Sequence, residues 1–199
     1  SYNSFDVLED GYGINLRPLS MFAASAYRDD PCTRFKPHIL DQNIYDVVDP
    51  GLVAKMHKAI TVIQFKVEGQ IIKRHPEYGL NHRCLLEHVD FDKGTVEVDG
   101  KTYPMLDMKF PTIDPKDPLK LTEQEAELLQ TLKMSFRHSG LLHKHIKFLY
   151  SHGSMYKCCN NNLLYHGCIP LKKDGSFDDI VFYGIPYSGK ALMDFVDQM

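Results

Sequence analysis

Several protein classes are excluded by what the sequence lacks. It has no excess of basic residues, with 23 lysines and arginines against 26 aspartates and glutamates, so it lacks the charge typical of a nucleic-acid-binding domain. It has no apolar run long enough to span a membrane. It also has no Gly-x-Ser-x-Gly motif and no complete phosphate-binding loop. What remains, 43% hydrophobic and 25% charged residues, is typical of an ordinary globular protein.

Cysteines at metal-binding or redox spacing are also missing. The five cysteines include one adjacent pair but no Cys-x-x-Cys pair, and their number is odd. A zinc ribbon or a disulfide framework is therefore not indicated. The pattern predicts buried, reduced thiols in a cytoplasmic protein.

The middle of the chain carries helical patterns. Apolar residues recur every three or four positions over residues 16–27 and 52–74, which predicts two amphipathic helices. Thr122 and Glu125 have the spacing of a capping box, and the helical pattern that they begin continues to about residue 150. Ser139-Gly140 is the expected break within it. A short helix is also expected around the stretch NHRCLLEHV.

The β signals are concentrated near the end of the chain, with one hairpin earlier. An Asp-Gly turn predicts a hairpin near residues 95–106. Residues 155–159 and 163–166 are expected to pair through an asparagine turn at residues 160–162. DIVFYGIPY adds a short strand or pair, and Ser188 is a candidate N-cap for a final helix. These patterns predict an α+β fold. Because the final helix pattern stops at Met199 without a C-terminal signal, we expect the sequence to be part of a longer chain.

Two groups of polar residues have an ordinary explanation. His138, His145 and His152 recur every seven residues, so a continuous helix would place them on one face. Neighbouring histidines would lie about 10 Å apart along the helix axis, which is too far for the three to share one metal ion. A solvated helix face is favoured, and His143 would pair with His145 only on a strand. Asp29-Asp30 fits no calcium loop and is interpreted as a charged turn.

His166 is the remaining candidate for chemistry. It lies at the end of a predicted strand and precedes Gly167, which would let a ligand approach closely. Two interpretations stay open at this point. The residues alone favour a hydrogen-bonded structural histidine over a site residue.

Several long stretches together resemble one known family. They are LEDGYGINLRPL, DDPCTRF, MHKAITVIQFKVEGQIIKRHPE, LLEHVDFDKGTVEVDGKTYPMLD, FPTIDPKDP and GSMYKCCNNNLLYHGCIPL. They resemble, in the family's order and through nearly the whole chain, the class III fructose-1,6-bisphosphatases of bacteria. That family is considerably longer than this chain and resembles the calcineurin-like metallophosphatases, which have two packed sheets flanked by helices and a two-metal site at the strand ends.

The resemblance implies a role for His166 and an activity for a longer parent protein. A strand ending in His-Gly supplies one metal ligand in such enzymes, and LLYHGCIP matches it, so His166 is implied to be a ligand in a two-ion Mn²⁺ site. The implied reaction is the hydrolysis of fructose 1,6-bisphosphate to fructose 6-phosphate and phosphate in gluconeogenesis. The family's other ligand elements, Asp-x-His, Gly-Asp and Gly-His, do not occur in this sequence. The chain alone is therefore expected to be inactive, and its other catalytic, substrate-binding and effector residues are not identified.

The resemblance also implies how the chain is organised. Residues 1–28 would form a helix segment flanking the phosphatase core, and residues 29–150 a mainly helical insertion carrying the hairpin. Residues 151–199 would be an incomplete part of the calcineurin-like β-sandwich, ending in a helix. The implied partners are a sugar bisphosphate, the rest of the parent chain and a homo-oligomer, without nucleic acid or membrane. The insertion could serve as a lid, a regulatory site or an oligomer contact. The alternative is a free-standing α+β binding or scaffolding module without catalysis.

Overall fold

The chain forms two compact units, Ser1–Gly140 and Leu141–Met199. A computed structural model describes residues 5–38, 49–165 and 167–199. Helices and small antiparallel sheets occur together, which confirms the α+β prediction. No helix in these ranges is both long and apolar enough to cross a membrane. The predicted boundary between insertion and core near residue 150 concerns the parent protein and stays a prediction.

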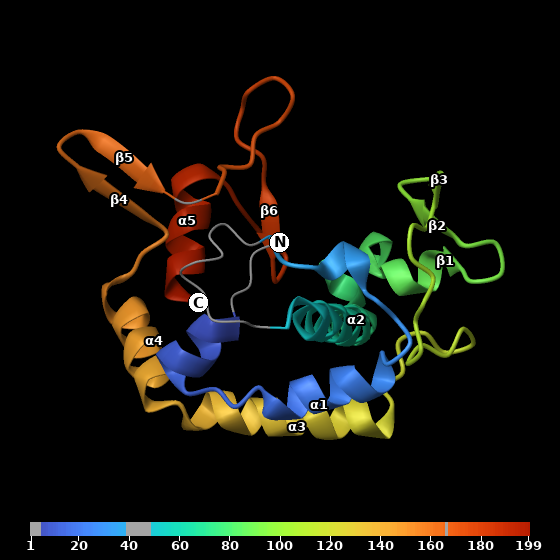
Figure 1. Ribbon diagram of the computed structural model, residues 1–199. Helices are drawn as coiled ribbons and strands as arrows, with labels where there is room; N and C mark the ends of the chain where they lie inside the picture. Colours follow the sequence, from blue (N-terminus) through green and yellow to red (C-terminus); the bar gives the residue numbers. More distant parts are fainter. Residues whose placement is uncertain (1–4, 39–48, 166) are drawn as a thin grey trace. The chain divides into compact units, whose positions relative to one another are not determined.

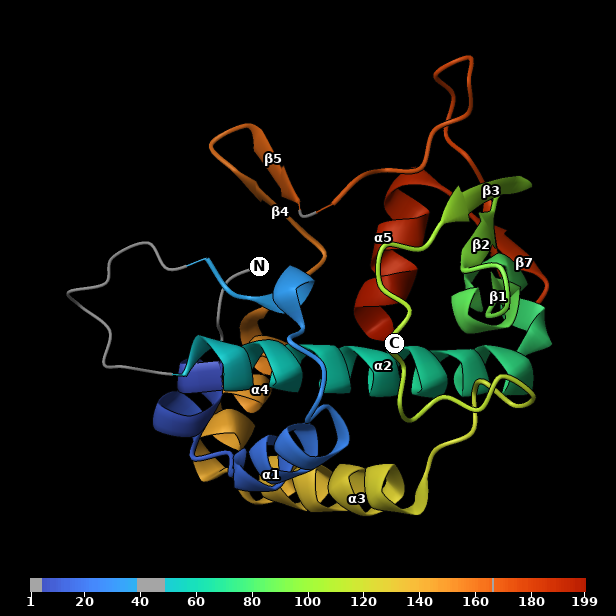
Figure 2. The same ribbon diagram turned by 45° about the vertical axis from the view of Figure 1, so that its right-hand side comes forward.

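Three α-helices form the frame of the first unit (Figure 1). They are α1 (Arg17–Ala26), α2 (Pro50–Arg74) and α3 (Glu123–His138), and they confirm the helical patterns. Both views show α1 beside α3, and α1 also packs against α2 (Figure 2). Apolar side chains of these helices and of the residues flanking α1 form one buried core, which includes Ile14, Leu16, Leu19, Ala23, Tyr27, Val53, Ala54, Ala59, Ile63, Leu128 and Leu132.

Local capping explains where these helices begin and end. The Asp49 carboxylate accepts the Gly51 N–H at 2.8 Å, at the start of α2. At α3, Thr122 Oγ1 accepts the Glu125 N–H at 3.2 Å and Glu125 returns the contact to the Thr122 N–H at 2.8 Å. The predicted capping box is therefore confirmed. α2 ends one residue before His75, where the next residue is proline.

A small sheet and several short helices complete the first unit. β1 (Val89–Asp90), β2 (Thr95–Val98) and β3 (Lys101–Pro104) form an antiparallel meander. Asp99 and Gly100 both have positive φ, at 50° and 72°, as the tight turn of the predicted hairpin requires. The stretch expected to form one short helix contains two separate 3₁₀ turns. The short helices are η1 (Val7–Gly11), η2 (Thr33–Phe35), η3 (Pro76–Tyr78), η4 (Asn81–Arg83) and η5 (Leu85–His88).

Two separate hairpins lie between two helices in the second unit. In chain order the elements are α4 (Gly140–His152), β4 (Tyr156–Cys159), β5 (Asn162–Tyr165), β6 (Ile180–Phe182), β7 (Ile185–Tyr187) and α5 (Gly189–Gln198). The asparagine turn is shorter than predicted. Asn160 and Asn161 have φ of 50° and 61°, whereas Asn162 already pairs with Cys159 in the sheet. Asparagine tolerates this left-handed backbone better than most residues.

The predicted break at Ser139-Gly140 is confirmed, because α3 ends at His138 and α4 begins at Gly140. His138 therefore lies on a different helix from His145 and His152, and all three histidines are exposed as expected. Ser188 occupies the N-cap position of α5 but makes no side-chain cap bond.

The cysteines also differ from the prediction, because only two of the five are buried. Cys32 and Cys84 are buried free thiols, whereas the three in the second unit are exposed, namely Cys158, Cys159 and Cys168. Spacing alone did not reveal that the second unit has so little interior.

Candidate functional site

The predicted metal ligand, His166, lies outside the described residues, but both of its neighbours are described. Tyr165 ends β5, where it pairs with Tyr156 of β4. Gly167 has a φ of +89°, a conformation that glycine adopts without strain. A Cβ at Gly167 would meet no atom within 4 Å. Among the described residues outside its chain neighbours, nothing therefore crowds the backbone at Gly167.

Polar side chains of α5 hold the base of the β4–β5 hairpin. The Tyr156 hydroxyl donates to Asp194 Oδ1 at 2.8 Å, and the Met155 N–H donates to Asp197 Oδ1 at 2.8 Å. The other oxygen of Asp194 accepts from Lys190 at 2.5 Å, and this amine also lies 5.5 Å from the centre of the Tyr156 ring. Tyr156, Asp194 and Lys190 therefore form one connected cluster.

The charges of this cluster are mutually stabilised. The Lys190 hydrogen bond, followed by that of Tyr156, lowers the pKa of Asp194. The hydrogen bond to Asp194 in turn raises the pKa of Lys190. Both groups consequently stay ionised through the neutral range, so the contact with Tyr156 is charge-assisted.

α5 is attached to the other hairpin, β6–β7, by apolar contacts. Phe195 stacks on Tyr187 of β7 with ring centres 4.2 Å apart and lies 5.1 Å from the ring of Phe182 in β6. Leu192 and Met193 of the same helix are buried. α5 thus contacts both hairpins of the second unit, one through rings and the other through carboxylates.

An open hollow of about 350 Å³ lies at the base of the β4–β5 hairpin. Its lining includes the basic side chains of Lys157 and His152 and the ring of Tyr165, the last described residue before His166. Its full lining is His152, Ser154, Met155, Tyr156, Lys157, Leu164 and Tyr165.

The described residues do not by themselves form a metal centre. They contain no group of three or more histidine, cysteine, aspartate or glutamate side chains able to hold an ion. The role of His166 as one metal ligand therefore stays a prediction.

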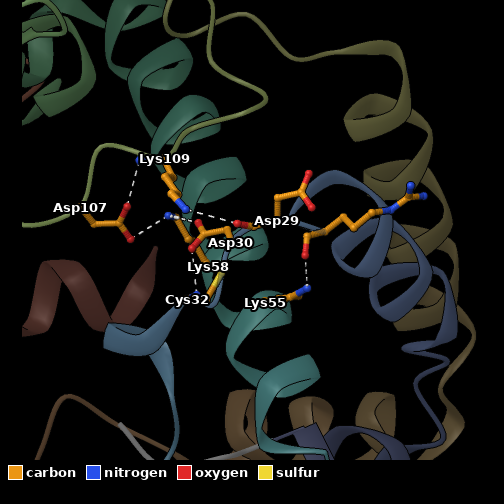
Figure 3. A network of polar contacts seen from close by, with 8 residues as sticks. Asp29, Asp30, Cys32, Lys55, Lys58, Asp107 and Lys109 are labelled. Carbon is orange, nitrogen blue, oxygen red and sulfur yellow. Dashed lines mark hydrogen bonds and ion pairs between the residues drawn. The ribbon is translucent and has the colours of Figure 1, made fainter.

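A second polar centre, in the first unit, was not recognised from the sequence (Figure 3). Lys58 of α2 is completely buried, and its amine contacts Asp30 Oδ2 at 2.5 Å and Asp107 Oδ2 at 2.7 Å. Three aromatic rings lie 5.3–6.0 Å from the same amine, those of Tyr27, Phe35 and Phe110. One cation therefore joins two segments that are far apart in the sequence.

Backbone donors satisfy the remaining oxygens of the two carboxylates. Asp30 Oδ1 accepts the Cys32 N–H and Asp107 Oδ1 accepts the Lys109 N–H, both at 2.9 Å. Burial alone would raise the pKa of Asp30, but the hydrogen bonds from Lys58 and from the Cys32 backbone outweigh it and lower this pKa. Burial, and next the charge of Asp30, raise the pKa of the Cys32 thiol to about 11. The carboxylate is therefore ionised and the thiol protonated at neutral pH.

Two further lysines close the rim of this centre (Figure 3). The amine of Lys109 donates to the Asp29 carbonyl at 3.2 Å, and that of Lys55 donates to the Arg28 carbonyl at 2.9 Å. These carbonyls belong to the turn that follows α1. The Lys55 contact ties this turn to α2, and the Lys109 contact ties it to the loop of residues 105–121.

A second buried lysine repeats the arrangement two turns further along α2. Lys66 and Glu125 are both completely buried, and Lys66 Nζ lies 2.7 Å from Glu125 Oε2. The same amine also donates to the Thr112 carbonyl at 2.6 Å. Gln70 then donates to the Leu119 carbonyl at 2.7 Å. Lys58, Lys66 and Gln70 thus bind the loop of residues 105–121 along α2. Each amine is held by two oxygen atoms of the protein, which favours a structural role for the two lysines.

The helical spacing of α2 already indicated that these two lysines are buried, although they interrupt its apolar pattern. Lys58 and Lys66 lie four residues on either side of Val62, a buried residue of α2, so they occupy core-facing positions. The interpretation of Asp29-Asp30 as a charged turn holds for the exposed Asp29. It is wrong for Asp30, because this carboxylate is buried against Lys58.

Comparison with known proteins places the whole chain within one group. A family model described as "Firmicute fructose-1,6-bisphosphatase" matches residues 1–199. Three relatives are each named "Fructose-1,6-bisphosphatase class 3". The protein from Clostridium novyi is 49% identical over 198 residues, and that from Finegoldia magna is 52% identical over 198 residues. The protein from Listeria monocytogenes is 50% identical over 193 residues.

These matches cover nearly the whole chain but only part of each relative. They span 100%, 99% and 97% of this chain, respectively, and 30% of each relative. The chain thus spans less than a third of the length of the curated relatives that it matches. No solved structure matches it.

Proposed function

The chain belongs to the Firmicute fructose-1,6-bisphosphatase family, and we propose on that basis that the protein containing it hydrolyses fructose 1,6-bisphosphate to fructose 6-phosphate and phosphate. The observation that carries this proposal is the family match over residues 1–199, together with about 50% identity to relatives of that name. Because the chain spans 30% of those relatives, the activity is assigned to the longer protein. The chain alone is proposed to be inactive.

The proposed contribution of this chain to the reaction is the imidazole of His166. Bound manganese would supply an activated water molecule and offset charge on the phosphoryl oxygens. Neutral His166 would hold one manganese ion through one ring nitrogen, while its other nitrogen donates the hydrogen bond that orients the ring. Gly167, which has no side chain, would keep the approach to this imidazole open.

The architecture that we propose for the longer protein follows from the same family. Residues 151–199 would belong to a calcineurin-like β-sandwich, which is supported by the two hairpins of the second unit and the few apolar side chains that they bury. Residues 29–150 would be an insertion. A cytoplasmic location, a sugar bisphosphate substrate and assembly into homo-oligomers are part of the same proposal.

The test is His166→Ala in the full-length protein. We expect manganese-dependent turnover of fructose 1,6-bisphosphate to fall by roughly 100-fold or more, because a metal ligand is lost. The melting temperature should stay unchanged. His138→Ala is the matched control, since this histidine is exposed on α3 and its ring nitrogen hydrogen-bonds to a backbone carbonyl of its own helix. Near-normal activity of the His166 variant would leave this residue with a structural role only.

The chain as given provides a second test in the same assay. With manganese supplied, the purified 199-residue chain should show no turnover where the full-length protein is active. Measurable turnover by the chain alone would mean that it contains a complete catalytic centre.

A further inference from the structure

We propose that α5 holds the β4–β5 hairpin in the position that the reaction needs, with Tyr156 and Asp194 as positioning residues for the segment that carries His166. This inference rests on the proposed role of His166. It assigns these residues a positioning role through the hairpin, not a role in binding substrate or metal directly.

The register of the hairpin links α5 to the end of β5. Tyr156 of β4 is the cross-strand partner of Tyr165, the last residue of β5. Opposed residues in an antiparallel pair lie about 4.5–5.5 Å apart between their Cα atoms. His166 follows Tyr165 directly in the sequence. The hydrogen bond from Tyr156 to Asp194 therefore acts on the residue pair next to the proposed ligand.

The hairpin depends on such an attachment because it has little else. Within the described part of the chain, β4 and β5 pair only with each other, and a two-stranded hairpin is marginally stable on its own. Leu163, Leu164 and Tyr165 of β5 are about half exposed, at 51%, 56% and 47%. Packing thus contributes little to fixing the hairpin, and the contacts with Asp194 and Asp197 gain importance.

α5 can serve as a support because its other side is fixed. The rings of Phe195, Tyr187 and Phe182 join it to β6 and β7, while Leu192 and Met193 are buried. Lys190 pairs with Asp194 one helical turn away, which restricts the carboxylate that Tyr156 contacts. The hairpin is thereby anchored to a helix that is itself held in place.

The size of the effect follows from the strength of one hydrogen bond. Loss of a single such bond lowers the equilibrium constant between the held and the released hairpin by about two- to tenfold. The apparent affinity for a ligand of the held state falls in proportion to the population of that state, by up to the same factor. We therefore expect a clear but incomplete loss of manganese affinity.

The experiment compares two tyrosine variants of the full-length protein. Tyr156→Phe removes the hydroxyl that contacts Asp194. Tyr165→Phe is the matched control, because it lies in the same residue pair and nearer to His166 but its hydroxyl has no partner among the described residues. Manganese affinity is measured by calorimetric titration, alongside kcat, KM and the melting temperature.

Tyr156→Phe should weaken manganese binding by about two- to tenfold and lower kcat, with KM nearly unchanged, whereas Tyr165→Phe should behave like the parent. Asp194→Ala should weaken binding further, because it also releases Lys190. Asp194→Asn keeps an acceptor for Tyr156 and should restore part of the loss.

If the two tyrosine variants have equal effects while His166→Ala abolishes the binding of one manganese ion, this inference is overturned. The proposed function is then left intact. If His166→Ala leaves manganese affinity unchanged, the proposed role of His166 as a metal ligand itself fails. Tyr156→Phe removes a single oxygen atom, so it tests the same contact even where Asp194→Ala lowers the melting temperature.

Discussion

The first unit buries two lysines inside an extensive apolar core, whereas Leu192 and Met193 are the only buried apolar side chains among the described residues of the second unit. Large apolar side chains are instead exposed in the second unit on both hairpins and on α4. They include Phe148, Leu149, Tyr150, Leu163, Leu164, Tyr165, Val181, Tyr183 and Ile185.

This contrast shows that forming an element and burying it are separate problems. The hairpins of the second unit have well-formed turns and ladders, because these need only residues close together in the chain. A core needs a second layer to cover each apolar face. The first unit supplies that layer through α1, α2 and α3, and the second unit supplies it only at α5.

The largest expected effect lies at the buried charges of the first unit. Lys58→Ala leaves the carboxylates of Asp30 and Asp107 without their cation and should lower the free energy of unfolding by about 3–5 kcal/mol. Lys55→Ala, three residues away, removes an exposed contact with a backbone carbonyl and should cost about 1 kcal/mol or less.

Urea unfolding followed by far-ultraviolet circular dichroism measures both variants, since the sequence has no tryptophan to report by fluorescence. Hydrogen exchange of α2 peptides assigns the change to the first unit. Similar losses for Lys58→Ala and Lys55→Ala would show that the buried cluster is not what holds this unit together.

Apolar truncation provides the next test of the contrast. Leu132→Ala removes a core side chain of α3 and should destabilise the first unit by about 2–5 kcal/mol. Leu163→Ala makes the same change on the exposed hairpin and should alter the stability of this chain by about 0.5 kcal/mol or less. Thermal unfolding of both variants distinguishes them, and a large loss at Leu163 would mean that the hairpin is already buried in solution.

Acid should affect the first unit through Asp30, with a smaller effect. Its pKa is lower in the folded chain than in an unfolded one, so its contribution is fully present above the ordinary aspartate value and is lost as the pH falls through the folded-state pKa. The stability advantage of the parent over Asp30→Asn should therefore be constant near neutrality and shrink below about pH 4. Urea midpoints between pH 3 and 7 measure it, and a difference that stayed constant throughout would contradict the ion pair.

Much of the local structure was predictable because its causes are local. The Thr122–Glu125 capping box, the Asp99-Gly100 turn and the stop of α2 before His75-Pro76 each involve residues within a few positions of one another. The misplaced features had weak local signals. Ser188 lies at an N-cap position without making the bond, and the asparagine turn has two residues rather than three.

The candidate site was only partly predictable. The motif around His166 was recognised by resemblance to a family, and the family model confirms the resemblance while leaving the role of His166 a prediction. The contacts of Tyr156 with Asp194 and of Met155 with Asp197 join residues about forty positions apart, and no spacing rule connects them.

The sequence by itself determined the family of this chain and the type, order and approximate ends of most of its elements, since capping, turns and periodicity act over one or two helical turns. Only the tertiary structure decided which charges are buried together. Lys58 meets Asp30 and Asp107 across 28 and 49 residues, and Lys66 meets Glu125 across 59. A buried cation requires a partner wherever the packed chain can bring one, and local sequence does not specify where that is.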